Sequence, residues 1–352
     1  MAMATEHHFR FMQRALFLAS LGMGKSSPHP LTGGIFVKNQ KIIAEGWYEK
    51  VFSTTLLSHL FSRVSNKFLL KGSFLYVSTL YDIELLSHID LLSAHEISGV
   101  VVANLISTDI KRSDLSHKLR KMGIEVVFGI LEKEEKSLNH RYYYAHQHHI
   151  PYIILKWAET ADGFIAREDY DSKWISHEFS RKIVHKWRAE EDAILVGTNT
   201  CQYDDPRLNA RTWEGNNPLR IVIDRHLRLL PDLHIFDKTQ PTICYNLMKD
   251  HKENNLEFVN LSDHTSAETS FIHALLSDLF RRNVQSLIIE GGSTILHQFI
   301  QEEFWNEARI FKAHHLFEQG IKAPLLSFAT LCNIDNYAGD RLFLFKNFLK
   351  TE

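Results

Sequence analysis

The pattern of apolar and polar residues predicts two successive α/β regions. In the first region, apolar residues recur at helical spacing between residues 11 and 19, before Gly22 and Gly24. Short apolar runs of strand length follow at residues 35–37, 41–44, 74–77, 99–102 and 125–128. A helix, a pair of strands and then alternating helices and strands are typical of a three-layer α/β domain.

The second region alternates buried strands with amphipathic helices. Strands are predicted at residues 152–156, 193–196, 219–223, 242–245 and 286–289. Helices are predicted at residues 178–188, 269–282 and 295–302. Buried strands that alternate with helices indicate a mainly parallel sheet with helices packed on it.

The stretch from Ser172 to Arg211 concentrates polar groups behind a buried strand. Ser176 is expected to cap a helix whose apolar face holds Phe179, Ile183, Val184 and Trp187. The strand at 193–197 ends in a glycine, and residues 198–211 are expected to form a polar loop with Asp204 and Asp205. Loops that follow buried strands are where α/β proteins place ligand chemistry.

Composition narrows the classes of protein that need to be considered. The 352 residues suffice for two domains, and the 44% hydrophobic and 23% charged residues are typical of a soluble globular protein. A formal net charge of -2 provides no global field for nucleic acid or an anionic membrane. The chain shows neither a membrane-length apolar run nor a signal-like N-terminus, so we expect a cytoplasmic protein. The three cysteines all follow residue 200 and fit no metal or disulfide spacing.

Several motifs in a fixed order carry a resemblance to a known family. Residues 174–211 contain W-I-x5-R-x3-H-x2-R-A-x2-D-A-I-L-V-G-x2-T-x3-D-D-P-R-L-x2-R, and further motifs lie at 156–163, 220–224 and 288–294. The chain resembles the bifunctional riboflavin-biosynthesis deaminase/reductase family over almost its whole length. The resemblance implies a cytidine-deaminase-like three-layer α/β/α domain at 1–148, followed by a dihydrofolate-reductase-like α/β domain at 149–352. A helix rich in tyrosine and histidine is expected near the boundary, at 132–149.

The first domain lacks the residues that a zinc-dependent deaminase requires. That chemistry needs one His and two Cys ligands and a nearby Glu as proton shuttle. The family's His-Ala-Glu falls on Thr55-Leu56-Leu57, its Glu-Pro-Cys region falls on Tyr81-Asp82-Ile83, and its pocket loop carries His29 and Thr32 here. We therefore expect no zinc and no deaminase activity. A substitute site built from His59, Asp82, His88 and His95 is the alternative, although their spacing matches no metal-binding pattern that we recognise.

The second domain retains the family's ligand-binding positions. A Gly291-Gly292 turn between a strand and a helix can present backbone N–H groups to a pyrophosphate. The resemblance implies cofactor contacts at Ala158, Trp174, Thr200, Asp204, Gly292, Ser293, Thr294, Ile295, Leu296, His297 and Gln298. It implies substrate contacts at Ser172, Arg188, Leu208, Arg211 and Glu290. Lys156 and Asp162 match a family pattern, but neither is assigned a catalytic role, and the catalytic residues stay unidentified.

A basic turn at 225–228 follows the strand at 219–223. Arg225 is predicted to contact the 2′-phosphate that distinguishes NADPH from NADH, because the planar guanidinium matches phosphate geometry. An exposed basic turn without a ligand is the alternative, and the sequence does not separate the two.

These observations lead to one functional hypothesis and two alternatives. The hypothesis is NADPH-dependent reduction of the ribosyl C1′ of 5-amino-6-(5-phosphoribosylamino)uracil, with no metal, by a homodimer that relies on a separate deaminase. The expected partner is this small phosphoribosylaminopyrimidine, not nucleic acid or a membrane. The first alternative is a bifunctional enzyme with an unrecognised deaminase site. The second is a non-enzymatic partner of a complete paralogue.

Overall fold

The computed structural model describes residues 2–52, 54–172, 175–266 and 269–350, which divide into two compact units. Unit 1 is Met1–Tyr143 and unit 2 is Tyr144–Glu352. The division falls inside helix α7 (His140–His148), upstream of the boundary expected at 148/149. Among the described helices, none is long and apolar enough to cross a membrane.

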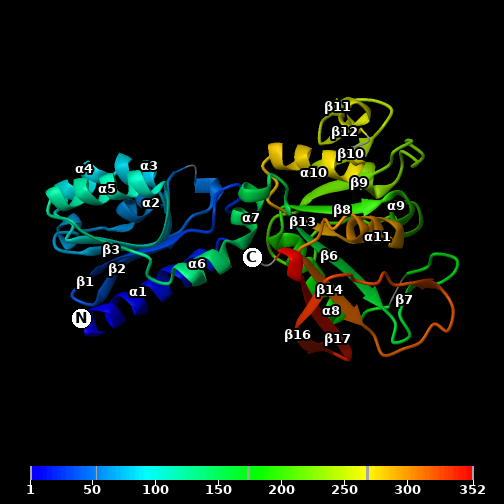
Figure 1. Ribbon diagram of the computed structural model, residues 1–352, viewed down its shortest axis with the longest axis horizontal. Helices are drawn as coiled ribbons and strands as arrows, with labels where there is room; N and C mark the ends of the chain where they lie inside the picture. Colours follow the sequence, from blue (N-terminus) through cyan, green and yellow to red (C-terminus); the bar gives the residue numbers. More distant parts are fainter. Residues whose placement is uncertain (1, 53, 173–174, 267–268, 351–352) are drawn as a thin grey trace. The chain divides into compact units, whose positions relative to one another are not determined.

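Unit 1 is built on a five-stranded mixed sheet in the order β2-β1-β3-β4-β5. Figure 1 labels β1, β2 and β3 of this sheet. Strand β1 is antiparallel to both β2 and β3, whereas β3, β4 and β5 are parallel. The strands are β1 (Gly33–Lys38), β2 (Lys41–Trp47), β3 (Phe74–Tyr81), β4 (Gly99–Ile106) and β5 (Glu125–Phe128). All five were expected from the apolar runs, and each extends to or beyond the predicted bounds.

Helices cover both faces of this sheet. Successive strand residues point to opposite faces, so a run of apolar residues places apolar side chains on both. Helix α1 (Ala2–Ser20) packs Met12 and Ala15 with Val101 on one face. Leu57 and Leu60 of α2 pack with Val100 on the other. The remaining helices of this unit are α2 (Leu56–Arg63), α3 (Asp82–Ser87), α4 (Ile89–Ala94), α5 (Asp109–Lys121) and α6 (Glu132–Leu138), with 3₁₀ turns at Lys50–Phe52 and Lys67–Leu69. The segment at 132–149 therefore forms two helices, α6 and α7, where one was expected.

Unit 2 contains a ten-stranded sheet in the order β11-β12-β10-β9-β8-β13-β6-β14-β17-β16. The strands from β12 to β14 in this order are all parallel, and the outer strands β11, β17 and β16 are antiparallel to their neighbours. The sheet comprises β6 (Tyr152–Glu159), β8 (Ala193–Gly197), β9 (Leu219–Ile223), β10 (Thr242–Asn246), β11 (His251–Glu253), β12 (Leu256–Asn260), β13 (Ser286–Ile289), β14 (Glu307–Lys312), β16 (Ala329–Tyr337) and β17 (Asp340–Asn347). A separate pair is formed by β7 (Phe164–Ala166) and β15 (Ile321–Lys322).

The helices of unit 2 lie on both faces of its sheet and bury alternate strand residues. On one face, Leu195 and Ile289 pack with α10 (Phe271–Arg281) and α11 (Ser293–Gln301). On the other face, Ile288 packs with α8 (Glu178–Glu190), and Val196 packs with α9 (Thr198–Asp204). Short 3₁₀ turns lie at His234–Phe236, Ser262–His264 and Phe348–Lys350. The sheet places the carboxyl ends of its parallel strands along one edge, where β6, β8, β9 and β13 end.

Three local predictions for this region were wrong, and some strands elsewhere in unit 2 were not predicted. The N-cap of α8 is His177, whose Nδ1 accepts from the backbone of Phe179, so Ser176 lies one residue too early. Phe179 itself is 52% exposed, because it lies in the first turn, before the buried stripe of the helix begins. The expected polar loop begins as helix α9. The strands β14, β16 and β17 were missed, and β16 is an outer strand with mostly exposed side chains, which leaves no alternating pattern to detect.

Candidate functional site

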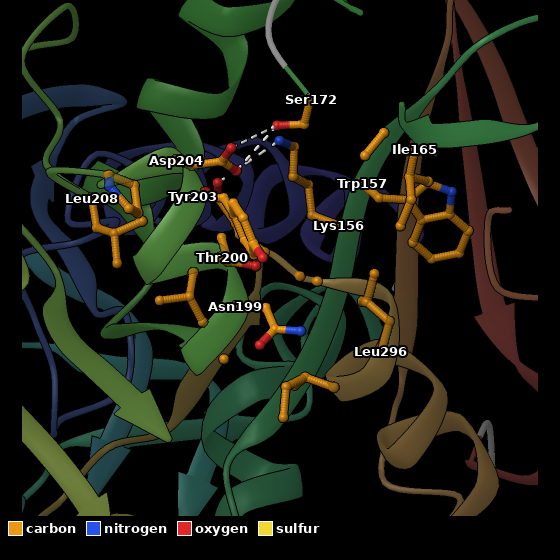
Figure 2. A pocket seen from close by; sticks show the side chains of 18 of the residues that line it. Lys156, Trp157, Ile165, Ser172, Asn199, Thr200, Tyr203, Asp204, Leu208 and Leu296 are labelled. Atoms are coloured by element: carbon orange, nitrogen blue, oxygen red, sulfur yellow. Dashed lines mark hydrogen bonds and ion pairs between the residues drawn. The ribbon is translucent and has the colours of Figure 1, made fainter. Parts of the chain in front are cut away.

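A cavity of about 1100 Å³ lies in unit 2, at the edge where the parallel strands end. It is lined by the ends of β6, β8, β9 and β13 and by residues of α8, α9 and α11. A volume of this size accommodates more than one small ligand. Figure 2 shows Lys156 of β6 pointing toward Asp204 of α9, whereas the ring of Trp157 lies on the other side of the strand.

Most of the predicted site residues line this one cavity. They are Ala158, Ser172, Arg188, Thr200, Asp204, Leu208, Arg211, Arg225, Glu290, Gly292, Ser293, Thr294, Ile295, Leu296 and Gln298. His297 does not line it, because its position on α11 is exposed and its ring bonds back to Ser293. Trp174 lies outside the described residues. The structure thus brings together side chains that are more than 100 residues apart in the sequence.

A buried ionic cluster forms the wall of the cavity. Arg188 donates from Nε and Nη2 to the two carboxylate oxygens of Glu290, over 2.8 and 2.7 Å. The Lys156 Nζ lies 3.8 Å from Glu290 Oε2. Burial alone would raise the pKa of Glu290, but the two cations lower it to about 2. Burial lowers the pKa of Lys156, and Glu290 opposes this shift, so the cluster carries one net positive charge when all three groups are ionised.

Arg211 provides a third cation at this wall. Its Nη1 donates to Asn209 Oδ1 over 3.1 Å, and among the described residues no carboxylate lies within ion-pair distance of it. Burial lowers the pKa of Arg211, and the neighbouring Arg188 lowers it further. An arginine that faces a cavity with no carboxylate beside it is suited to hold an anion such as a phosphate.

His185 lies beside these arginines and was not predicted as a site residue. It is 5% exposed, lines the cavity, and its Nδ1 lies 2.8 Å from the carbonyl oxygen of Asn209. Burial and then Arg188 lower the pKa of His185 to about 4. The ring is therefore neutral near pH 7, with Nδ1–H donating to that carbonyl. The sequence offered one signal, because His185 and Arg188 are three residues apart on the same helix.

The two adjacent carboxylates at the end of α9 have different roles. Asp204 faces the cavity and accepts from Ser172 Oγ, at 3.1 Å for each oxygen (Figure 2). Asp205 adopts a left-handed conformation (φ 40°) that ends the helix. Its carboxylate accepts from the backbone and the ring Nδ1 of His234, at 2.7 and 2.6 Å. Asp204 thus lies at the cavity wall, whereas Asp205 fixes a neighbouring loop.

The glycine turn fits a phosphate-bearing cofactor. Gly291 has φ 108°, which strongly favours glycine, and a Cβ added at Gly292 would lie 3.1 Å from Thr200 Oγ1. Helix α11 begins immediately afterwards, at Ser293, so its free backbone N–H groups lie at the cavity wall. The backbone at Gly291 has open space beside it, and a helix N-terminus follows directly. Such a turn is suited to bind a pyrophosphate.

Two arginines after β9 face the same cavity. Arg225 donates to Gln298 Oε1 over 3.3 Å, and its guanidinium lies 4.6 Å from the centre of the Phe271 ring. Arg228 also lines the cavity. By contrast, Asp162 lies elsewhere, where it accepts from the backbone of Phe317 and Glu318. Asp162 therefore stabilises the loop at Phe317 and Glu318. The predicted contact of Arg225 with a 2′-phosphate stays a prediction.

Unit 1 shows what occupies the positions of the deaminase residues. Thr55 caps α2 by accepting from the Ser58 backbone N–H, and Leu56 and Leu57 are buried in the core. The carboxylate of Glu84 lies 3.4 Å from the Leu57 N–H, and burial raises the pKa of Glu84. A hydroxyl and two aliphatic side chains do not fit a zinc ion or a proton shuttle.

The substitute metal site has no support in the described side chains. His88 bonds to Ser58 Oγ through Nε2 over 3.0 Å, and His95 packs its ring on Phe61. Within the described part of the chain, no group of three or more His, Cys, Asp or Glu side chains is placed to hold a metal ion. The side chain of Asp82, a member of the proposed set, lies outside the described side chains.

Comparison with known proteins agrees with this arrangement. The model of the RibD C-terminal domain matches residues 151–317. The riboflavin biosynthesis protein RibD of Chlamydia pneumoniae is 31% identical over 87% of this chain and 84% of its own length. RibD of Aquifex aeolicus is 29% identical over 96% of this chain and 98% of its own.

A solved structure extends the match to the whole fold. The diaminohydroxyphosphoribosylaminopyrimidine deaminase/5-amino-6-(5-phosphoribosylamino)uracil reductase of Thermotoga maritima superposes with a TM-score of 0.84. It is 26% identical, and the match covers 98% of this chain and 99% of that one. RibD of Acinetobacter baumannii, at 22% identity and a TM-score of 0.81 over 97% of this chain and 99% of its own, has the same fold.

Fold and cavity define the class of protein: a deaminase-like α/β domain followed by a dihydrofolate-reductase-like reductase domain. Within that class, the chain belongs to the RibD family of riboflavin biosynthesis. The resemblance and the fold class predicted from the sequence are confirmed.

Proposed function

We propose that this chain is an NADPH-dependent 5-amino-6-(5-phosphoribosylamino)uracil reductase that has lost the deaminase activity of its first domain. The observation that carries the proposal is a contrast between the two units. The cavity of unit 2 combines the glycine turn with an anion-binding wall, whereas unit 1 has Thr55, Leu56 and Leu57 where zinc chemistry needs a histidine and a glutamate.

The residues of the cavity divide into two groups with different tasks. The turn at Gly291–Gly292 and the start of α11 would hold the pyrophosphate of the cofactor, with Arg225 and Arg228 near its 2′-phosphate. When bound, NADPH supplies the hydride that reduces C1′ of the ribosyl group. Near Arg188, Arg211 would pair the phosphate of the substrate.

The buried cluster would orient the substrate between these two ends. Glu290 is held ionised and fixed by Arg188, so it can accept hydrogen bonds from polar groups of the substrate only in one orientation. Lys156 lies at the cavity wall, and burial lowers its pKa, so a proton on its amine is easier to transfer than one on an exposed lysine. Ser172 and Asp204 form a further polar contact across the cavity.

Loss of the deaminase activity has a consequence for the supply of substrate. If the first domain is inactive, a separate hydrolytic deaminase must provide the deaminated pyrimidine. The alternative of an unrecognised deaminase site predicts ammonia release by the purified chain, and the non-enzymatic alternative predicts no reaction with either pyrimidine.

Isotope transfer tests the proposed reaction directly. The purified chain is incubated with the deaminated pyrimidine and NADPH that carries deuterium at C4, each face labelled in turn. We expect one labelled face to deliver deuterium to C1′ of the ribitylamino product, detected by mass spectrometry. A product without deuterium from either cofactor, or no product at all, would contradict the proposal.

A further inference from the structure

Two tyrosines that the proposed reaction does not yet use are stacked at the wall of the cavity. The rings of Tyr170 and Tyr203 lie with their centres 4.5 Å apart and their planes 10° from parallel. Both line the cavity, yet they are 40% and 49% exposed. Large aromatic rings left exposed inside a cavity are available to a ligand.

The place of Tyr203 on α9 shows which part of the cavity the pair occupies. Helix α9 begins beside the glycine turn, where Thr200 Oγ1 would meet a Cβ at Gly292. Tyr203 lies three residues further on, roughly 4.5 Å along the helix axis, and directly before Asp204. Figure 2 shows its ring between Thr200 and Asp204, on the cavity side of the helix. The pair is thus displaced from the pyrophosphate end, toward the Ser172–Asp204 hydrogen bond.

The backbone at Tyr170 gives a second, independent observation. Tyr170 has φ 68°, a left-handed conformation in which a bulky residue is unfavourable by roughly 1–2 kcal/mol and glycine or asparagine is preferred. The turn is closed by hydrogen bonds from Arg167 N to Asp171 O and from Tyr170 N to Arg167 O, which any residue could make. The turn therefore does not require a tyrosine. The tyrosine side chain adds the stacking contact of its ring with the ring of Tyr203.

We propose that the Tyr170–Tyr203 pair is a stacking platform for the pyrimidine ring of the substrate, an inference that rests on the proposed function. Each ring has one face covered by its partner, and an outer face can take a planar heterocycle. Stacking on an aromatic side chain tolerates many ring substituents, so it supplies affinity while the polar groups of the cavity supply orientation. Tyr170 and Tyr203 would thus contribute to pyrimidine binding without taking part in hydride transfer.

Three variants of the full chain test this platform in steady-state assays with both ligands. For Tyr203→Ala we expect the KM of the pyrimidine to rise roughly ten-fold or more, with the KM of NADPH within about two-fold of wild type. Tyr203→Phe keeps the ring and should keep the wild-type KM. Tyr170→Asn suits the left-handed turn, so it should keep or raise the melting temperature while it raises the KM of the pyrimidine.

Several results would overturn the platform. One is an unchanged KM of the pyrimidine in both Tyr203→Ala and Tyr170→Asn. Another is a raised KM of NADPH in place of a raised KM of the pyrimidine. A third is a lower melting temperature of Tyr170→Asn together with an equal rise in the KM values of both ligands. Calorimetric titration of the pyrimidine alone gives the same comparison without turnover. If wild type itself neither binds nor reduces the pyrimidine, the proposed function fails; if wild type does so and the variants match it, only the platform fails.

Discussion

Replacing Arg188 by methionine removes the partner that holds Glu290 in its ionised, fixed state. The two side chains are 11% and 8% exposed, and their bidentate contacts are 2.8 and 2.7 Å long. Breaking a buried pair by removing one partner costs about 3–5 kcal/mol, because the other charge stays buried without compensation. Lys156, at 3.8 Å, still compensates part of that charge, so we expect about 2–4 kcal/mol of lost stability.

The same change shifts the pH range over which the domain is stable. In wild type the pKa of Glu290 is held at about 2, below its usual value, so its contribution is present at neutral pH and is lost only as pH falls toward 2. Without Arg188 the pKa of Glu290 rises, so this carboxylate takes up a proton as pH falls and no longer leaves a buried charge. The stability difference between wild type and Arg188→Met should therefore shrink toward acid pH. Urea unfolding followed by tryptophan fluorescence measures both effects, because the buried Trp157, Trp187 and Trp305 all report on unit 2.

Two variants serve as controls for Arg188→Met. Lys186→Met lies on the same helix and removes an ion pair to Glu190 whose side chains are 37% and 24% exposed, so stability should change by less than about 0.5 kcal/mol. Arg211→Ala should also leave stability nearly unchanged but raise the pyrimidine KM, because a charge-assisted phosphate contact of roughly 1.5–3 kcal/mol is lost. If Arg188→Met is as stable as Lys186→Met, or if Arg211→Ala weakens NADPH binding instead, the reasoning about this wall is wrong.

Three further predictions concern the cofactor, the pH profile and the core. Arg225→Ser should still allow turnover but narrow the preference for NADPH over NADH by roughly fivefold, on the order of 1 kcal/mol; an unchanged ratio of kcat/KM values means that Arg225 does not contact the 2′-phosphate. Burial lowers the pKa of His185 to about 4, so its contribution to the free energy of unfolding is present above about pH 6.5 and is lost as pH falls toward 4. The melting temperature of wild type should therefore fall across this pH range, and that of His185→Gln should fall less. Arg220 is 1% exposed and bonds Asp237, Thr242 and the His234 carbonyl, so Arg220→Met should lower the free energy of unfolding by about 2–4 kcal/mol, whereas the more exposed Arg281→Met should change it by less than about 0.5 kcal/mol.

The sequence predicted the elements that have strong apolar patterns. The strand 286–289 is found at the predicted bounds, because the aliphatic run Leu287–Ile289 lies just before Glu290 and two glycines. The outer strand β16 was missed, since exposed strands carry little hydrophobic signal. Helix α9 was missed because its seven residues, TNTCQYD, are mostly polar and bury only Cys201.

Within the site, the sequence predicted most of the residues that line the cavity, but not the direction in which each side chain points. The resemblance singled out Asp204 over Asp205, but the sequence did not show that the left-handed end of α9 directs one to the cavity and the other to His234. The stacking of Tyr170 on Tyr203 joins two segments 33 residues apart through a turn that propensity alone would not give a tyrosine. Local sequence patterns do not predict such non-local contacts.

The central claim is reduction without deamination, and a paired assay of the purified chain tests it most directly. The chain is supplied with NADPH and, in separate reactions, with the deaminated and the undeaminated phosphoribosylaminopyrimidine. We predict cofactor oxidation with the deaminated compound, no ammonia release from the other, and no stoichiometric zinc after a chelator wash. Ammonia release together with stoichiometric zinc, or no oxidation with the deaminated compound, would contradict the account.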